Sequence, residues 1–217
     1  MKLALLALLV ATGAFAQSDD LINPDRPGIA DGSATIGRGR FQIETGAERD
    51  DASDSRTLTT PTLVRYGVSE ALELRVEGEG WQHELGDGSS WQPASIGLKY
   101  HFFDKPSLGV IARVFPTEHE GDVRLAADID LNEHWSLNPN VGVDRHSATA
   151  ALTVQYNLSK RLNVFVDGGA ERSSLLLDTG VAWIIGRDTQ LDASVGWGAH
   201  GADNPNVFFS AGISRRF

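Results

Sequence analysis

Charged side chains recur at every second position in several segments of this chain. Glu73, Arg75 and Glu77 form one such set, and Arg124, Asp128 and Asp130 continue another. This spacing places charges on one face of an extended strand. Charges that face a water-filled interior act on a passing solute through their field and by pairing, without catalysis. We expect a charged lumen lined by Glu73, Arg75, Glu77, Lys99, Arg113, Arg124, Asp128, Asp130, Asp167, Asp178 and Asp192.

Residue types that support catalysis are present but poorly arranged. An acyl-transfer site needs a serine, a histidine and an orienting polar group at matched positions. His146 and Ser147 follow Asp144 at the expected outer end of a strand, but they do not form the His-x-Ser type of pattern seen in barrel phospholipases. The sequence therefore predicts no catalytic residues, and an enzyme acting at the outer loops is kept as an alternative.

Two acidic clusters could instead hold a divalent cation. One contains Glu118, His119, Glu120 and Asp122, and the other pairs Asp144 with His146. Charged loop residues are most often solvated surface, and the chain has neither zinc-ligand spacing nor a dinucleotide fingerprint. We therefore expect no metal and no cofactor.

The elements that carry these residues are strands. From Arg40 onward apolar and polar residues alternate, as in Phe41, Ile43 and Thr45 against Gln42 and Glu44. No helical period competes. Short turns alternate with more variable connections, two of which are long, at residues 46–56 and 79–95. This layout predicts an all-β, antiparallel up-and-down barrel of about twelve strands.

The apolar row of a membrane barrel faces outward, whereas that of a soluble barrel faces inward. Aromatic residues near the short turns favour the membrane, because aromatic rings collect where hydrocarbon meets water. These residues are Tyr66, Phe102, Phe103, Trp135, Tyr156 and Trp183, and Phe217 ends the chain on the same side. Strands cross lipid only as a closed barrel, since every backbone group needs a partner there. We therefore expect a transmembrane barrel.

The first residues read as an export signal. Met1-Lys2 precedes an apolar run, and Ala14-Phe15-Ala16 fits a cleavage site near Ala16. We expect a signal peptide at 1–16, an extended periplasmic segment at 17–36 and a barrel at 37–217 in the outer membrane of a Gram-negative bacterium. The formal charge is −10, which argues against a nucleic-acid partner, and the absence of cysteine excludes disulfides.

Two motifs lie at the start of the expected mature chain. Asp25-Arg26-Pro27 stands about a dozen residues before a Gly-x-x-Gln-x-Glu-x-Gly strand at residues 39–46. Together they resemble the family of outer-membrane β-barrel transporters named for the meta-pathway of phenol degradation. The resemblance implies uptake of small aromatic or hydrophobic compounds. We also expect Arg26 to pair with a lumen carboxylate as part of a plug, with a loose periplasmic tail as the alternative.

These observations predict a passive outer-membrane channel for small solutes. The alternatives are an occluded structural barrel, in which opposite charges close the lumen, and the outer-membrane enzyme described above. Expected partners are outer-membrane lipid and lipopolysaccharide, the barrel-assembly machinery through Phe217, and a small-molecule solute. We expect the protein to be a monomer.

Overall fold

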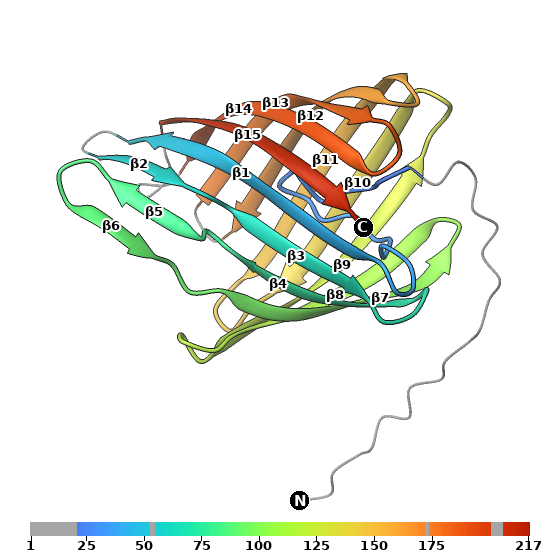
Figure 1. Cartoon of the computed structure of the whole chain (residues 1–217), viewed down its shortest axis with the longest axis horizontal. Coiled ribbons are helices and arrows are strands. Elements are labelled where there is room, and N and C mark those ends of the chain that lie inside the picture. The colour runs from blue at the N-terminus through green and yellow to red at the C-terminus, as the bar shows by residue number, and fades with distance from the viewer. Residues whose placement is uncertain (1–20, 53–54, 172–173, 201–205) are drawn as a thin grey trace, which may run out of the picture.

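The structure, a computed structural model, describes residues 21–52, 55–171, 174–200 and 206–217. The proposed signal peptide at 1–16 lies outside the described residues. Within them, twelve strands form the wall, each antiparallel to the next, and β15 pairs with β1 to close the barrel (Figure 1). The wall strands are β1 (Phe41–Asp51), β3 (Thr62–Gly67), β4 (Leu72–Gly78), β7 (Ser95–Asp104), β8 (Ser107–Phe115), β9 (Glu120–Asp130), β10 (Trp135–Val143), β11 (Ala148–Ser159), β12 (Leu162–Glu171), β13 (Ser174–Ile185), β14 (Thr189–His200) and β15 (Val207–Arg216). The predicted barrel of about twelve strands is confirmed.

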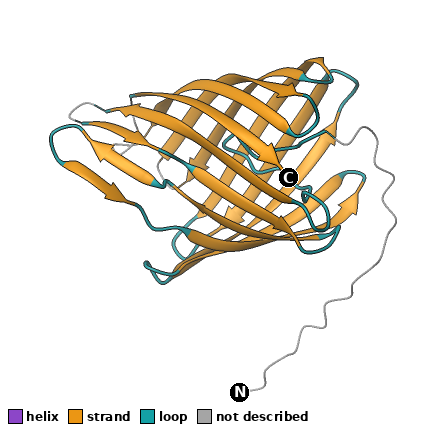
Figure 2. Ribbon diagram, in the orientation of Figure 1, coloured by secondary structure: helices purple, strands orange, loops and turns teal. Residues whose placement is uncertain are grey.

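Three short strands extend the wall at one side of the outer rim. β2 (Arg56–Thr59), β5 (Trp81–Glu84) and β6 (Gly88–Trp91) continue β3, β4 and β7 beyond breaks at residues 60–61, 79–80 and 92–94. We call these three strands the flap. Pro61 and Pro93 lack the N–H that a ladder needs, and Gly80 adopts a φ of 64°. Figure 2 shows the flap strands beyond these loops.

The prediction of two long loops at residues 46–56 and 79–95 is therefore wrong. Residues 46–51 complete β1, and most of 79–95 forms the β5–β6 hairpin. All four residues of β6 are exposed, so this strand has no buried face to impose an apolar alternation on its sequence. Period two marks a strand only where one of its two faces is buried.

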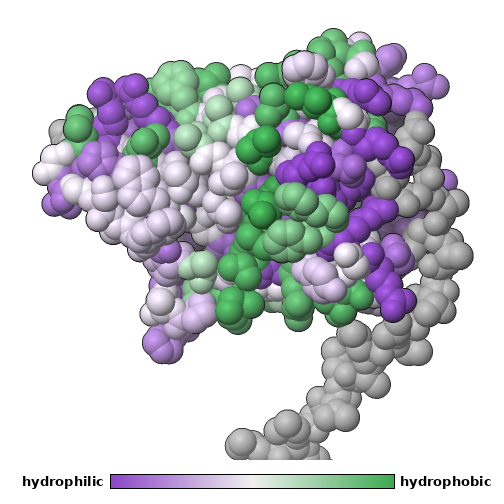
Figure 3. Space-filling view, in the orientation of Figure 1, coloured by the Kyte–Doolittle hydropathy of each residue, from purple (hydrophilic) through white to green (hydrophobic). Residues whose placement is uncertain are grey.

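The wall has its apolar side outside. Val76, Leu98 and Val166 are 44%, 46% and 59% exposed, whereas Glu73 and Lys99 are fully buried. A green apolar band crosses the visible face of the barrel, with hydrophilic residues toward both ends (Figure 3). This polarity fits lipid outside and a polar lumen inside. Among the described residues, no helix is long and apolar enough to cross a membrane.

Aromatic side chains ring the end of the barrel that carries the short turns. Tyr66, Phe102, Trp135, Trp183 and Phe217 are all exposed there. Arg215 also faces outward, at the end of the apolar row of β15. Its Nη1 donates to Thr189 Oγ1 at 2.6 Å, and its guanidinium lies 5.8 Å from the centre of the Phe217 ring. A cation at this interface therefore has both a hydrogen bond and an aromatic face.

The outward polarity can be tested with paired arginine substitutions. Val166→Arg, in the middle of β12, is expected to lower the free energy of unfolding by about 2–4 kcal/mol, because it places a charge near the centre of the bilayer. Leu158→Arg, near the turn end of β11, should cost about 0–1 kcal/mol. Reversible denaturant unfolding in lipid vesicles measures both. Equal costs for the two variants would contradict the assigned depth.

Candidate functional site

Residues 21–36 lie inside the barrel, and we call them the plug. The chain enters beside the β13–β14 turn, where Ile22 N donates to Arg187 O at 2.7 Å. It leaves beside the β3–β4 turn, where Thr35 Oγ1 donates to Glu70 O at 2.5 Å. Both contacts lie at the end that carries Phe217. The plug therefore rises into the lumen from this end, the periplasmic one, and returns to it before β1 begins (Figure 1).

The lumen wall has a cationic side. Each of the neighbouring strands β3, β4, β7, β8 and β9 turns one cation inward. These cations are Arg65, Arg75, Lys99, Arg113 and Arg124. Strands β10 to β14 contain no lysine or arginine within their described bounds, and their inward positions carry amides, hydroxyls and the carboxylates Asp167, Asp178 and Asp192. The five cations are therefore confined to one side of the lumen, where inward carboxylates such as Glu73, Glu77 and Asp122 accompany them.

Asp25 of the plug lies against the cationic side. Lys99 Nζ is 2.8 Å from Asp25 Oδ2, and Arg75 Nη1 donates to the same oxygen at 2.5 Å. Arg65 Nη1 lies 3.8 Å from Asp25 Oδ1. Burial raises the pKa of Asp25, but the surrounding cations Arg65, Lys99 and Arg75 outweigh it and hold this pKa well below its usual range. Asp25 thus stays ionised and anchors the plug.

Arg26 points toward the opposite side. Its Nη2 donates to Asp192 Oδ1 at 3.2 Å and to Ser210 Oγ at 2.9 Å. Gly46 and Gly212 face each other across the β1–β15 seam and make room for the guanidinium. A Cβ at Gly46 would lie 2.7 Å from Arg26 Nη2, and one at Gly212 would lie 2.5 Å from Arg26 Nε. Larger residues at these two positions would displace Arg26.

The first strand also holds the plug backbone. Glu44 Oε2 accepts from the backbone N–H groups of Asp25 and Arg26, each at 2.9 Å, and Gln42 Nε2 donates to Glu44 Oε1 at 2.8 Å. The two motifs that carried the family resemblance are therefore in direct contact. Asp25-Arg26-Pro27 docks on the inward face that Gln42, Glu44 and Gly46 present.

Further contacts attach the rest of the plug to strands on both sides. Asp31 and Asn140 form two mutual hydrogen bonds of 2.9 Å, from Asp31 N to Asn140 Oδ1 and from Asn140 Nδ2 to Asp31 O. Additional bonds run from Ile29 N to Asp167 Oδ2 at 2.7 Å, from Ser33 Oγ to Asp128 Oδ2 at 2.6 Å and from Ile36 N to Glu73 Oε2 at 3.0 Å. Hydrogen bonds that involve wall side chains therefore hold the plug, and its described residues form no β-ladder with the wall.

The structure places every lumen residue named from the sequence on the inward face. Glu73, Arg75, Lys99, Arg113, Asp167, Asp178 and Asp192 are buried, Glu77, Arg124 and Asp128 are partly exposed, and Asp130 is exposed at the periplasmic rim. Arg65, which the sequence suggested only as a partner of Glu73 in an occluded barrel, binds Glu44 at 3.0 Å and Glu73 at 2.8 Å. Its inward register between Val64 and Tyr66 was the available signal.

Asp122 was assigned to an outer-loop cluster, and that assignment is wrong. It belongs to β9, is buried, and accepts from Arg113 Nε at 2.8 Å and Nη2 at 2.6 Å. Glu120, also in β9, instead lies 2.9 Å from His146 Nε2, and this pair is solvent-accessible. Across the described ranges, no group of three or more histidine, cysteine or carboxylate side chains is placed to hold a metal.

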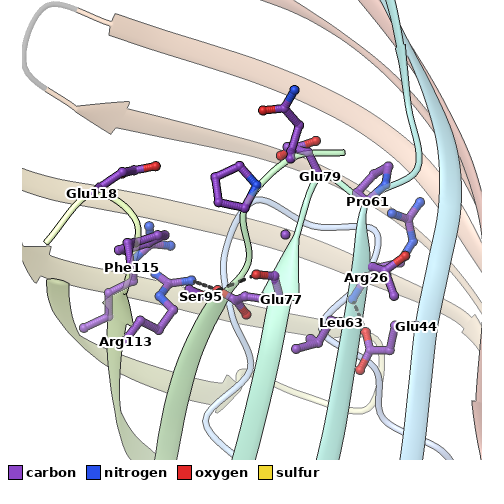
Figure 4. Close-up of a pocket in the computed structure, with 15 residues that line it drawn as sticks. Arg26, Glu44, Pro61, Leu63, Glu77, Glu79, Ser95, Arg113, Phe115 and Glu118 are labelled. Atoms are coloured by element: carbon purple, nitrogen blue, oxygen red, sulfur yellow. Dashed lines mark hydrogen bonds and ion pairs between the residues drawn. The ribbon is translucent and has the colours of Figure 1, made fainter. Parts of the chain in front are cut away.

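Two of the cavities that border the plug are lined by Arg26. The vestibule, about 430 Å³ on the flap side, is lined by residues that include Glu44, Pro61, Glu77, Arg113 and Phe115 (Figure 4). In it Arg113 Nη1 donates to Glu77 Oε1. The lower cavity, about 290 Å³, lies on the periplasmic side between the plug and strands β9 to β14. Arg26 lines both cavities, so it stands between them.

A closed strand wall with an apolar outside and a charged, plug-containing lumen defines an outer-membrane β-barrel. Within this class, the chain belongs to the family described as "Putative MetA-pathway of phenol degradation", whose model matches residues 24–217. The resemblance inferred from the two motifs is thereby confirmed. No curated protein matches the chain.

Solved structures share this fold. The chain is similar to the COG4313 outer membrane channel from Pseudomonas putida F1, with a TM-score of 0.60 and 14% identity over 90% of this chain and 100% of that one. The KdgM porin has a TM-score of 0.60 and 9% identity, over 81% of this chain and 99% of that one. The CymD monoaromatic hydrocarbon channel has a TM-score of 0.52 and 10% identity, over 83% of this chain and 89% of that one. All three are channels or porins. At these identities the likeness shows the fold.

If Asp25 anchors the plug, replacing its carboxylate should loosen residues 22–36. Asp25→Asn leaves the fully buried Lys99 without its carboxylate, and breaking a buried pair costs about 3–5 kcal/mol. Amide hydrogen exchange of residues 22–36 should therefore accelerate by about 100-fold or more. Asp51→Asn is the matched control, because Asp51 pairs with Arg49 and Arg56 at the exposed rim. Unchanged exchange in Asp25→Asn would refute the anchor.

Proposed function

We propose that this protein is a passive outer-membrane channel for small solutes, and that the plug makes its narrowest point at Arg26. The supporting observation is that the vestibule and the lower cavity meet at this side chain. A solute that moves from one cavity to the other passes the guanidinium. Opening requires only that Arg26 leave Asp192 and Ser210, and no strand pairing has to break.

An occluded structural barrel is the main competing role. A wall of this size can fill its interior with its own side chains. Here several inward positions are glycines instead, and the plug fills the space they leave: Gly46 and Gly212 face Arg26, Gly109 faces Ser33 and Gly169 faces Ile29. A lumen that is filled by a separate segment, with one arginine at the junction of two cavities, suits a gated path better than a core filled by the wall's own side chains.

An enzyme at the outer rim is less well supported. Ser147 Oγ donates to Asp144 Oδ2 at 3.2 Å, while the His146 ring is engaged with Glu120. One serine–histidine contact occurs on the flap, where Ser89 Oγ lies 3.0 Å from His83 Nδ1. No described carboxylate forms a hydrogen bond with the other ring nitrogen of His83, so this pair lacks an orienting group.

The solute class is proposed from the vestibule and the relatives. Pro61, Leu63 and Phe115 give the vestibule an apolar patch beside Arg113 and Arg124. The family description and the CymD relative concern aromatic compounds. Small aromatic solutes are therefore one candidate class, and the patch would receive the ring.

The proposed partners follow from the surface. The outward apolar belt would contact lipid and lipopolysaccharide, and the protein would act as a monomer. Phe217 is 68% exposed and its ring centroid lies 6.1 Å from that of Phe41, at the seam where the barrel closes. An accessible terminal aromatic at the periplasmic rim supports recognition by the barrel-assembly machinery.

Single-channel conductance in a planar bilayer tests the proposal. Refolded protein should give discrete steps, and Arg26→Ala should raise the step size several-fold, because it removes the side chain at the junction of the cavities. Arg49→Ala, which alters an exposed rim arginine, should leave the step size unchanged. A correctly folded barrel that never gives steps would instead support the occluded structural role.

A further inference from the structure

The lower cavity differs chemically from the rest of the lumen. Its wall is rich in amide side chains, contributed by the plug and by strands β10, β11, β12 and β14. They are Asn23, Asn138, Gln155, Asn157, Asn163 and Gln190. The hydroxyls of Ser136 and Thr153 join them, and Phe165, Ala182 and Ile184 form a small apolar part of the same lining. Amides are uncharged and both donate and accept hydrogen bonds.

Part of this hydrogen-bonding capacity is unused. Gln155 Nε2 donates to Asn157 Oδ1 at 2.8 Å, and this is the side-chain bond of both residues within the described chain. The carbonyl of Gln155 and the amino group of Asn157 are thus left for another partner. The side chain of Asn163 makes no hydrogen bond to any described residue. These three residues lie on the adjacent strands β11 and β12, with Asn157 directly opposite Asn163.

The charges around the lower cavity are already engaged or lie at its rim. Asp25 and Arg26 are held by the wall, and Asp128 accepts from both Asn138 Nδ2 and Ser33 Oγ. Asp130 and Lys160 are exposed at the mouth. An ion that moved past these rim charges would lose water without gaining an opposite charge, whereas a neutral hydroxyl or amide exchanges its water hydrogen bonds for those of the wall.

The plug is placed so that this neutral side remains accessible. Asp25 and Asp31 draw it toward the cationic strands β4, β7 and β8, through Arg75, Lys99 and Arg113. The cavity remains on the other side, against β10 to β14. A solute that has passed Arg26 therefore meets amides before it meets free charge.

We propose that the lower cavity is a binding and sieving site for small neutral solutes that carry several hydroxyl or amide groups, such as short polyols. The wall amides bind the polar groups, and the apolar part formed by Phe165, Ala182 and Ile184 covers the carbon skeleton. This inference rests on the proposed channel function and names its solute class. It predicts that the polar groups of a solute control passage more strongly than its ring content.

Polyol flux compared with ion conductance tests the site. The probe is erythritol, followed by swelling of proteoliposomes, with KCl conductance measured on the same preparations. The double variant Gln155→Leu/Asn163→Leu keeps side-chain size and removes hydrogen bonding. We expect its erythritol flux to fall about fivefold or more while KCl conductance changes less than about twofold. Asn163→Ala alone, which removes bulk as well, should lower erythritol flux without lowering conductance.

Thr149→Val is the matched control. Thr149 lines a third cavity of about 140 Å³, which shares no lining residue with the lower cavity. This variant removes one hydrogen-bonding group outside the lower cavity and should leave erythritol flux unchanged. Unchanged erythritol flux in both amide variants, or a fall matched by KCl conductance, would overturn the polyol site and leave the channel intact. If the folded wild-type barrel passed neither ions nor erythritol, the proposed channel function would fail, and this inference with it.

Discussion

The ionised carboxylate of Asp25 is the contact on which the arrangement of the lumen depends. Arg75 and Lys99 are buried on neighbouring wall strands, and Asp25 is the partner that they share. Buried cations of this kind are costly unless they are paired. The plug supplies this carboxylate, so it stabilises the wall, and the wall cations in turn hold the plug in place.

The direction of the plug follows from the same requirement. Asp25 and Arg26 are adjacent in the chain and carry opposite charges, and the lumen offers cations on one side and Asp192 on the other. In the observed orientation each of these two plug charges meets an opposite charge of the wall. The glycines at 46 and 212 supply the space that this orientation needs.

Strand alternation predicted much of this structure, because a wall between lipid and water imposes period two on its residues. The inward register of Arg75 and Lys99 follows directly from it. Alternation states which face a residue occupies, but it does not give the partner across the lumen. The contact between Asp25 and Lys99 spans 74 positions and has no local signal. The β5–β6 hairpin of the flap was missed for a related reason, since none of the residues in its two strands is buried.

The seam between β1 and β15 joins the two ends of the chain, and Arg26 lies directly behind it. Gly46 and Gly212 face each other across this seam, Arg26 bonds to Ser210 of β15, and Glu44 of β1 binds the plug backbone. The segment that divides the lumen thus also bridges the first and last strands of the wall. The closure of the cylinder and the filling of its interior therefore draw on the same contacts, so that the plug acts as an internal clasp on the β1–β15 seam.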